Sequence, residues 1–282
     1  MIVMRMKKVA LFDRNILSTF SQVAAVLSTI ATLFSLFAGI PECLKKPLGI
    51  AFLVSLVLIY LCIWISANRT RKAKVKINGS NVNIFVGDIF SQEGLKIIGV
   101  NDFYDTINDD KIIAKKTLHG QFLKKYESSI AEIDNCISSD KALENFVVEK
   151  SVNRAPGKST RYQLGTVFKY DDYILSAFTK FNNGNEAWLN AEEYVGFWMN
   201  FWKNIDGIYA GRTINIPLMG AGITRFKNGK PSKQELLETM LLTLKISGFQ
   251  CTYTDTYINF VVYAQDADEI DFYKIKKTSW QS

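Results

Sequence analysis

Two long uncharged stretches near the start of the chain dominate its pattern of hydrophobic and polar positions. Residues 15–41 carry no charged side chain, and neither do residues 47–68. Since a helix needs ~20 mostly apolar residues to cross a bilayer, each stretch predicts a membrane-spanning helix. Only residues 42–46 separate the two stretches, so we expect an antiparallel hairpin with 42–46 as its turn.

Small and polar residues recur at spacings of three and four along the first stretch. Such a stripe lies on one side of a helix, and in lipid it is buried against another helix. Two interpretations stay open: the stripe packs on the second helix of the hairpin, or it joins several copies of the chain. Its members are Ser18, Ser21, Gln22, Ala25, Ser28, Thr29, Thr32, Ser35 and Gly39.

From residue 77 onward, short runs rich in Val, Ile, Phe and Tyr alternate with helical patterns. Helices are predicted at 120–138, at 186–204 and from Ser232, where Glu235 completes a capping box and Gly248 can end the helix. This alternation predicts a three-layer α/β domain with a mixed, largely parallel sheet, which binds ligands beyond the carboxyl ends of its strands. The predicted strands are 81–87, 95–101, 164–170, 173–179, 213–219 and 257–263.

The net charge of +7 is unevenly distributed. Residues 1–76 hold eleven Lys and Arg against two acidic residues, so residues 77–282 are slightly acidic, which argues against nucleic acid as a partner. The chain therefore divides into a membrane hairpin with a basic linker, 1–76, and a globular domain, 77–282. Basic residues flank both ends of the hairpin, so we expect a multi-pass protein of the cell inner (plasma) membrane with both termini and the globular domain cytoplasmic. The basic run 69–76 should contact anionic lipid.

The residues that bind metals or act as nucleophiles are sparse. His119 is the only histidine, and none of the cysteines forms a C-x-x-C pair, so we expect no metal site. Nothing pairs His119 with a nucleophile motif, and we expect an ordinary loop histidine. The cysteines are Cys43, Cys62, Cys136 and Cys251.

A predicted strand in the second half of the chain ends in small residues. The stretch 214–226 reads INIPLMGAGITRF, with Arg212 and Arg225 close by. Backbone N–H groups without side chains in the way can form a concave nest for a phosphate. The pattern alone also fits a plain glycine turn after a core strand, and both arginines are expected to face solvent.

Three short motifs, in this order, resemble a macro domain, the ADP-ribose-binding α/β module. The run Val86-Gly87-Asp88-Ile89 is similar to the G-D-I that opens most macro domains, and 220–223 is similar to their G-x-G-I phosphate loop. The last strand carries an aromatic residue, Tyr263, as theirs do. A macro domain behind a two-helix membrane hairpin resembles ThsA, the membrane-anchored effector family of Thoeris anti-phage defence.

The resemblance implies a role for each matching residue. Asp88 would accept a hydrogen bond from the adenine amino group, assisted by the Ile89 N–H, and Tyr263 would stack on adenine. Asn101 matches the first asparagine of their distal-ribose loop. The diphosphate would be wrapped by the backbone N–H groups of Gly220, Ala221, Gly222, Ile223 and Thr224.

One departure from the family pattern bears on catalysis. Hydrolytic macro domains show N-A-A-N and then a glycine run, whereas residues 100–106 read VNDFYDT. The departure argues against an enzyme and favours an altered ligand, an ADP-ribose-type cyclic or conjugated nucleotide. Asn101, Asp102 and Asp105 either line that ligand or form an Asx-type turn.

The family resemblance implies a sensor-effector without metal or cofactor. A TIR-domain partner would make the nucleotide signal from NAD, the macro domain would bind it, and the helices would then disrupt the membrane, with homo-oligomers forming on activation. The alternatives are a membrane-tethered hydrolase of ADP-ribose esters and an adaptor for ADP-ribosylated proteins. The sequence leaves open the nucleotide, the number of chains, the order of a pore and the identity of the partner.

Overall fold

The computed structural model describes residues 9–154, 156–182, 184–253 and 255–280. The chain forms two compact units. One comprises Met1–Ala73 with Ile270–Ser279, and the other comprises Lys74–Glu269 with Trp280–Ser282. The C-terminal segment 270–279 therefore belongs with the N-terminal helices.

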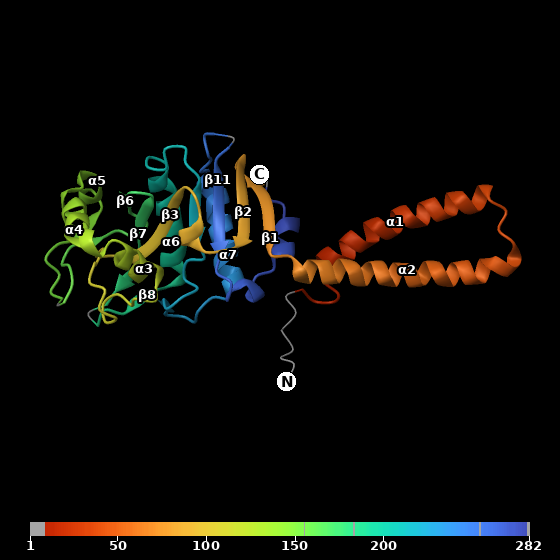
Figure 1. Cartoon of the computed structure of the whole chain (residues 1–282), viewed down its shortest axis with the longest axis horizontal. Coiled ribbons are helices and arrows are strands. Elements are labelled where there is room, and N and C mark those ends of the chain that lie inside the picture. Colours follow the sequence, from red (N-terminus) through yellow and green to blue (C-terminus); the bar gives the residue numbers. More distant parts are fainter. Residues whose placement is uncertain (1–8, 155, 183, 254, 281–282) are drawn as a thin grey trace. The chain divides into compact units, whose positions relative to one another are not determined.

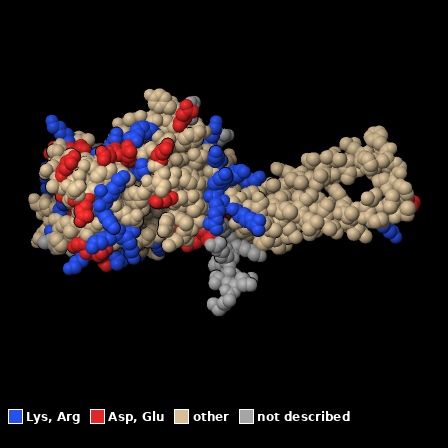
Figure 2. Space-filling view, viewed as in Figure 1, with Lys and Arg blue, Asp and Glu red and all other residues tan. Residues whose placement is uncertain are grey.

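The first unit is built on two long helices, α1 (Arg14–Phe37) and α2 (Glu42–Arg69). Both are long and apolar enough to cross a membrane, and Figure 2 shows their surface as tan, without charged residues, over most of its length. The predicted turn at 42–46 is wrong, because these residues already lie in α2 and the connection is 38–41. A helix start at Glu42 suits the chemistry, since a carboxylate in the first turn is stabilised by the helix dipole.

The stripe of small residues on α1 is exposed and does not form the described contact with α2. α1 meets α2 through other residues: Ile16 is buried, and the ring of Phe20 packs edge-on against Tyr60 at 5.2 Å. The interpretation that the stripe packs on the second helix of the hairpin is therefore wrong. The exposed members are Ser18, Ser21, Gln22, Ala25, Ser28, Thr29, Thr32, Ser35 and Gly39.

Polar side chains of α2 hold the segment that precedes α1. The Val9 N–H donates to Asn68 Oδ1 at 3.1 Å, and Trp64 Nε1 donates to the Val9 carbonyl at 3.1 Å. The Tyr60 hydroxyl donates to the Leu11 carbonyl. Because residues 60, 64 and 68 are spaced by one helical turn, they lie on one face of α2.

The second unit contains a nine-stranded sheet with the order β1-β2-β11-β9-β3-β7-β8-β10, and β6 pairs with β7. In Figure 1 the labelled strands β3, β11, β2 and β1 follow in this order, and the unlabelled β9 lies between β3 and β11. The pairings from β2 to β7 and of β8 with β10 are parallel, whereas β7 pairs antiparallel with β8 and β6. The prediction of a mixed, largely parallel sheet is confirmed. The strands are β1 (Lys72–Ile77), β2 (Ser80–Val86), β3 (Leu95–Asn101), β6 (Val167–Tyr170), β7 (Tyr173–Phe181), β8 (Ala187–Leu189), β9 (Ile214–Pro217), β10 (Arg225–Phe226) and β11 (Tyr257–Val262). A separate two-stranded sheet pairs β4 (Val147–Glu149) with β5 (Arg161–Tyr162).

The sheet begins earlier than residue 77. β1 starts at Lys72, within the basic run that the sequence analysis treats as a linker. It turns into β2 through Asn78 and Gly79, both with positive φ, 49° and 78°. Two such residues form the type I′ turn that joins antiparallel strands.

Helices cover both faces of the sheet. Phe178 of β7 packs against Phe197 of α6 on one face, and Ile98 and Val100 of β3 join a core with Phe122 of α3 on the other. The helices are α3 (Leu118–Lys125), α4 (Ile130–Ser139), α5 (Lys141–Glu144), α6 (Ala191–Ile205) and α7 (Lys233–Ser247), with 3₁₀ turns η1 (Ile89–Ser91), η2 (Glu127–Ser129) and η3 (Ala267–Glu269).

The helix predictions succeed where caps are strong. The Ser232–Glu235 capping box is present, and Gly248 ends α7 with a left-handed φ of 72°. The helix predicted at 120–138 is broken by η2, and the one predicted at 186–204 begins only at Ala191, because β8 precedes it. Asn190 and Glu193 form a second capping box there.

Three asparagines form a ladder across neighbouring strands. Asn83 Nδ2 donates to Asn259 Oδ1 at 2.9 Å, and Asn259 Nδ2 donates to Asn215 Oδ1 at 2.8 Å. The buried Asn215 amide donates in turn to the carbonyls of Glu93 and Leu95. The ladder therefore ties β2, β11 and β9 to the connection that enters β3.

Candidate functional site

The carboxyl ends of β2, β11 and β9 lie at one edge of the sheet. Val86 is opposite Val262, and Val261 is opposite Pro217, all in parallel pairing. The residues that follow these strands are therefore neighbours at the edge where open α/β sheets bind ligands. They include Asp88, Tyr263 and the loop 218–224.

Asp88 is exposed directly after β2. Its Oδ1 accepts from the Phe90 N–H at 3.0 Å, and its Oδ2 accepts from Ser91 Oγ at 3.3 Å. These contacts cap η1 and hold the carboxylate in one orientation, with lone pairs left for a ligand because a carboxylate accepts about four hydrogen bonds. Ile89 is buried beneath it.

The loop after β9 opens with a tight turn. The Ala221 N–H donates to the Leu218 carbonyl, and Gly220 has a φ of 87°, as a type II turn requires at its third residue. The glycine turn left open by the sequence is thus present, and it leads into Gly222, Ile223 and Thr224, none of which is buried.

A lysine that the sequence analysis missed shapes this loop. Lys230 Nζ donates to the carbonyls of Ala221 and Gly222 at 2.8 and 2.5 Å. In a trans peptide the N–H points opposite to the carbonyl, so the N–H groups of Gly222 and Ile223 face away from Lys230. The loop thereby presents successive donors on one side, as a phosphate nest needs.

Tyr263 is the first residue after β11. Its side chain is 57% exposed, while its carbonyl accepts from the Asp266 N–H at 2.9 Å. The backbone is therefore held and the ring remains accessible for stacking on a planar group.

The polar residues after β3 are directed into the protein. Asn101 Oδ1 accepts from the Phe103 N–H at 3.0 Å, which forms the Asx-type turn, and its Nδ2 donates to Asp105 Oδ2 at 3.0 Å. Asp102 is 1% exposed and accepts from the Phe181 N–H at 3.0 Å. Asn101 ends the neighbouring strand β3 and Asp102 follows it, but the structure gives their side chains internal partners.

A cationic loop, 152–161, supplies the other partners of these acids. Arg154 Nη1 lies 2.8 Å from Asp105 Oδ2, with both side chains at most 2% exposed, and Arg161 Nε lies 3.1 Å from Asp102 Oδ2. Burial raises the pKa of Asp102 to about 6, although the Phe181 N–H and the Arg161 charge oppose the shift. Only the density of basic residues in that loop could have signalled these contacts.

Three further expectations concern Arg212 and Arg225, expected to face solvent, and His119, expected in a loop. Arg212 pairs with Asp172 at 2.6 Å and Arg225 with Glu186 at 3.2 Å, and both arginines are partly exposed. His119 is not a loop residue: it lies in α3 and is buried, which lowers its pKa to about 3.

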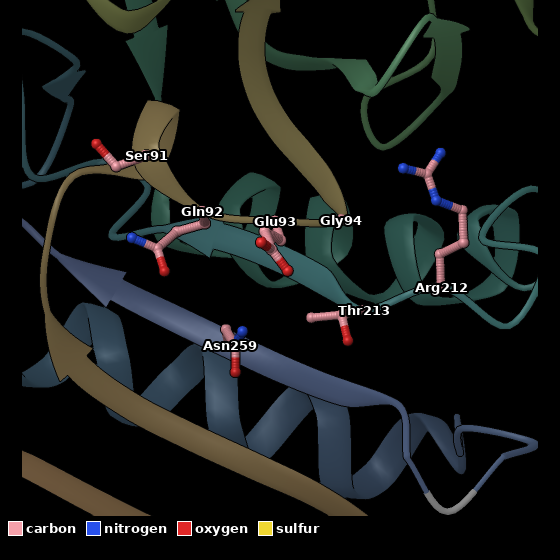
Figure 3. A pocket seen from close by; sticks show the side chains of 7 residues that line it. All are labelled: Ser91, Gln92, Glu93, Gly94, Arg212, Thr213 and Asn259. Atoms are coloured by element: carbon pink, nitrogen blue, oxygen red, sulfur yellow. The ribbon is translucent and has the colours of Figure 1, made fainter.

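Two hollows lie apart from the predicted site residues. One of about 600 Å³ is lined by residues 91–94, Arg212, Thr213 and Asn259. Figure 3 shows the β2–β3 connection passing over the sheet there, with Arg212 directed away from Asn259. The other, of about 560 Å³, is lined mainly by apolar surface around Phe181 and Trp188.

Comparisons with known proteins agree with the motifs at the sheet edge. The family described as "Thoeris protein ThsA, Macro domain" matches residues 82–263. The Thoeris protein ThsA of Bacillus amyloliquefaciens (strain Y2) is 40% identical over 208 residues, which are 72% of this chain and 69% of that protein.

Solved structures of an Oceanobacillus iheyensis macrodomain are more distant. The structure with ADP is 14% identical with a TM-score of 0.41, and it covers 73% of this chain and 94% of that one. The structure with MES bound is 15% identical with a TM-score of 0.41 and the same coverage. The family match and the 40% identical relative confirm the resemblance drawn from the motifs: the chain belongs to the Thoeris ThsA family and carries its macro domain.

Proposed function

We propose that this chain is a membrane-anchored sensor-effector of Thoeris anti-phage defence that binds an ADP-ribose-type nucleotide at the carboxyl edge of its sheet. The observation that carries the proposal is the meeting of Asp88, Tyr263 and the loop 218–224 at the ends of adjacent parallel strands. The family match supplies the defence context. Two helices that could cross a membrane supply the anchor.

Each part of the nucleotide finds a chemically suited group. The free lone pairs of Asp88 suit the adenine amino group, because a carboxylate only accepts hydrogen bonds. The exposed Tyr263 ring suits stacking, and the backbone donors at 220–224 suit the diphosphate. The Ile89 N–H would add a hydrogen bond at the adenine ring.

The distal end of the ligand meets a different surface from that of a hydrolytic macro domain. Asn101 and Asp102 bond to protein partners, so they would shape the wall of the site through the backbone rather than through free side chains. This supports binding of an intact cyclic or conjugated nucleotide over its hydrolysis.

The membrane half of the proposal rests on α1 and α2. The exposed stripe on α1 offers small residues to other copies of the chain, and close backbone approach drives such association in lipid. Nucleotide binding would shift the helices toward an assembled state that disrupts the membrane. The nucleotide would come from a TIR-domain partner, and the sheet domain and both termini would face the cytoplasm.

Recovery of the bound nucleotide tests the function. Full-length protein in detergent is incubated with a nucleotide extract from cells that contain a TIR-domain Thoeris partner, and the bound material is released and weighed by mass spectrometry. We expect an intact ADP-ribose-type compound that Asp88→Asn does not retain. A cleaved product would instead establish the hydrolase, and an empty site would overturn the proposal.

A further inference from the structure

The C-terminal helix α8 (Phe272–Lys277) belongs to the unit of the N-terminal helices, although it directly follows the sheet in sequence. We propose that α8 is a restraint that holds the membrane hairpin at rest, and that nucleotide binding beside Tyr263 releases it. This inference rests on the proposed function, since it concerns how the same site would control the helices.

The restraint has a defined polar contact at the start of α1. The Tyr273 hydroxyl lies 2.8 Å from Thr19 Oγ1, and the Thr19 hydroxyl also donates to the Asn15 carbonyl at 2.8 Å. The two hydroxyls can therefore bond to each other with Thr19 as acceptor and Tyr273 as donor.

Packing surrounds this hydrogen bond. Tyr273 packs, as Trp64 of α2 does, against a small buried core of Val9, Ile16 and Ala67, which joins α1 and α2. Tyr273 thus brings α8 into contact with the place where both helices meet.

An aspartate caps each of the two helices that meet here. Asp13 caps α1 and accepts from the Asn15 N–H at 2.8 Å, and Asp271 caps α8 and accepts from the Lys274 N–H at 2.8 Å. Burial raises the pKa of Asp271, and the Asp13 charge adds to the shift.

The nucleotide site has a direct covalent connection to α8. Tyr263 follows β11, and the segment 264–271 with η3 runs from it to α8. A ligand stacked on Tyr263 acts on the first residue of this segment. The ligand can release α8 from the hairpin only if it binds the released state more tightly than the restrained state, because a ligand shifts an equilibrium by its differential affinity.

Conservative hydroxyl deletions test the restraint. Full-length protein is placed in dye-loaded vesicles of phosphatidylethanolamine and phosphatidylglycerol, and leakage is measured without nucleotide. Loss of a hydrogen bond worth ~1 kcal/mol should raise nucleotide-independent leakage about fivefold in Tyr273→Phe and in Thr19→Val. The double variant should add little further, because both changes remove the same bond. Tyr273→Ala, which also removes the ring, should leak more.

A matched control exists in the other unit. The Tyr209 hydroxyl lies 2.6 Å from Thr252 Oγ1 and also accepts from the Thr252 N–H at 2.9 Å. Tyr209→Phe therefore deletes a tyrosine–threonine hydroxyl contact, and one further hydrogen bond, away from the hairpin, and it should leave leakage unchanged. Binding of ADP-ribose gives a second readout: since coupling is reciprocal, Tyr273→Phe should bind ADP-ribose about fivefold more tightly, whereas a merely structural contact would leave that affinity alone.

The outcomes separate this inference from the proposed function. Suppose that vesicles with the Tyr273 variants do not leak without nucleotide, whereas vesicles with the unmodified protein leak when ADP-ribose is added. This result would overturn the restraint and leave the proposed function standing. If the Tyr273 variants leak but bind ADP-ribose with unchanged affinity, the link between the α8 restraint and the nucleotide site is overturned. If neither ADP-ribose nor the nucleotide extract of cells that contain the TIR-domain partner yields a ligand that binds any of the proteins, the proposed function fails and the inference falls with it.

Discussion

The Gly87 N–H donates a hydrogen bond to the Val262 carbonyl at 3.0 Å. This bond continues the β2–β11 pairing past the end of β2, so the residues that follow, Asp88 and Tyr263, are held at the same edge of the sheet. Residues far apart in sequence thereby lie at the edge where we propose that the nucleotide binds.

Asp88→Asn should weaken nucleotide binding. The substitution keeps an oxygen that can cap η1 and replaces the other acceptor with a donor. Loss of a hydrogen bond to a charged group costs ~1.5–3 kcal/mol, which is about 10- to 100-fold in Kd. Calorimetry with ADP-ribose measures the change. Asp109→Asn, at another exposed turn-capping carboxylate, is the control, and equal affinities for the two variants would contradict the assignment.

Gly222→Val should impair binding without destabilising the fold. A Cβ at this position meets nothing within 4 Å, so the free protein tolerates it, whereas a bound diphosphate would meet the new side chain. We expect Kd to rise about tenfold, or ~1.4 kcal/mol, with an unchanged melting temperature. Gly196→Val, at another open position, should leave Kd unaltered; if it does not, the effect is not local to the loop.

Arg154→Leu should strongly destabilise the sheet domain. Arg154 and Asp105 are buried together, and removing one partner of a buried pair leaves a charge unpaired at a cost of ~3–5 kcal/mol. The exposed pair of Arg212 and Asp172 provides the comparison, because Arg212→Leu should cost only ~0–1 kcal/mol. Denaturant unfolding measures both values, and similar losses would show that burial of the first pair is unimportant.

Acid should destabilise the protein through His119. Burial and the Lys158 charge lower the pKa of His119 from 6.5 to about 3. Between these two pKa values the unfolded chain therefore binds more protons than the folded protein. The free energy of unfolding is unaffected by His119 above pH 6.5 and decreases as pH falls toward 3, and the loss amounts to about 3 kcal/mol at pH 4. His119→Gln should remove that part of the pH dependence. Asp102 contributes to the pH dependence of stability with the opposite sign, because its pKa is raised in the folded protein. This contribution cancels when the unmodified protein and the His119→Gln variant are compared at each pH.

The exposed stripe on α1 should be required for membrane disruption but not for binding. Replacing Ala25 and Thr29 by Leu blocks close approach of helices while it leaves the buried contacts of Ile16 and Phe20 with α2 in place. Nucleotide-triggered leakage from vesicles should fall, with an unchanged Kd for ADP-ribose. Persistent leakage would show that copies assemble through another face.

The long, regular elements were predictable from sequence, and the short or charged ones were not. β2, β3, β7 and β11 follow from their apolar runs, and α7 follows from its two caps. β1 reads KAKVKI, which alternates with period two as a strand does, but its lysines drew attention to lipid contact instead. β8 and β10 have only three and two residues, which is too few to show an alternating pattern. Their strand conformation depends on pairing with distant segments.

The candidate site divides in the same way. The glycine loop and Asp88 could be predicted, because backbone conformation and motif lie together in the sequence. The contacts of Lys230 with the loop, and of Arg154 with Asp105, join separate segments through the fold, so no local pattern announces them. The Asx-type turn of Asn101 was one of two open interpretations, and only the side-chain geometry supports it.

The ladder of Asn83, Asn259 and Asn215 has a mechanical consequence. If β11 slipped by one residue, both side-chain hydrogen bonds of Asn259 would break at once, and every side chain of the strand would turn to the opposite face. The ladder therefore resists sliding of β2, β11 and β9 past one another. A ligand at their carboxyl edge would thus act on the three strands together, and on the segment that follows β11.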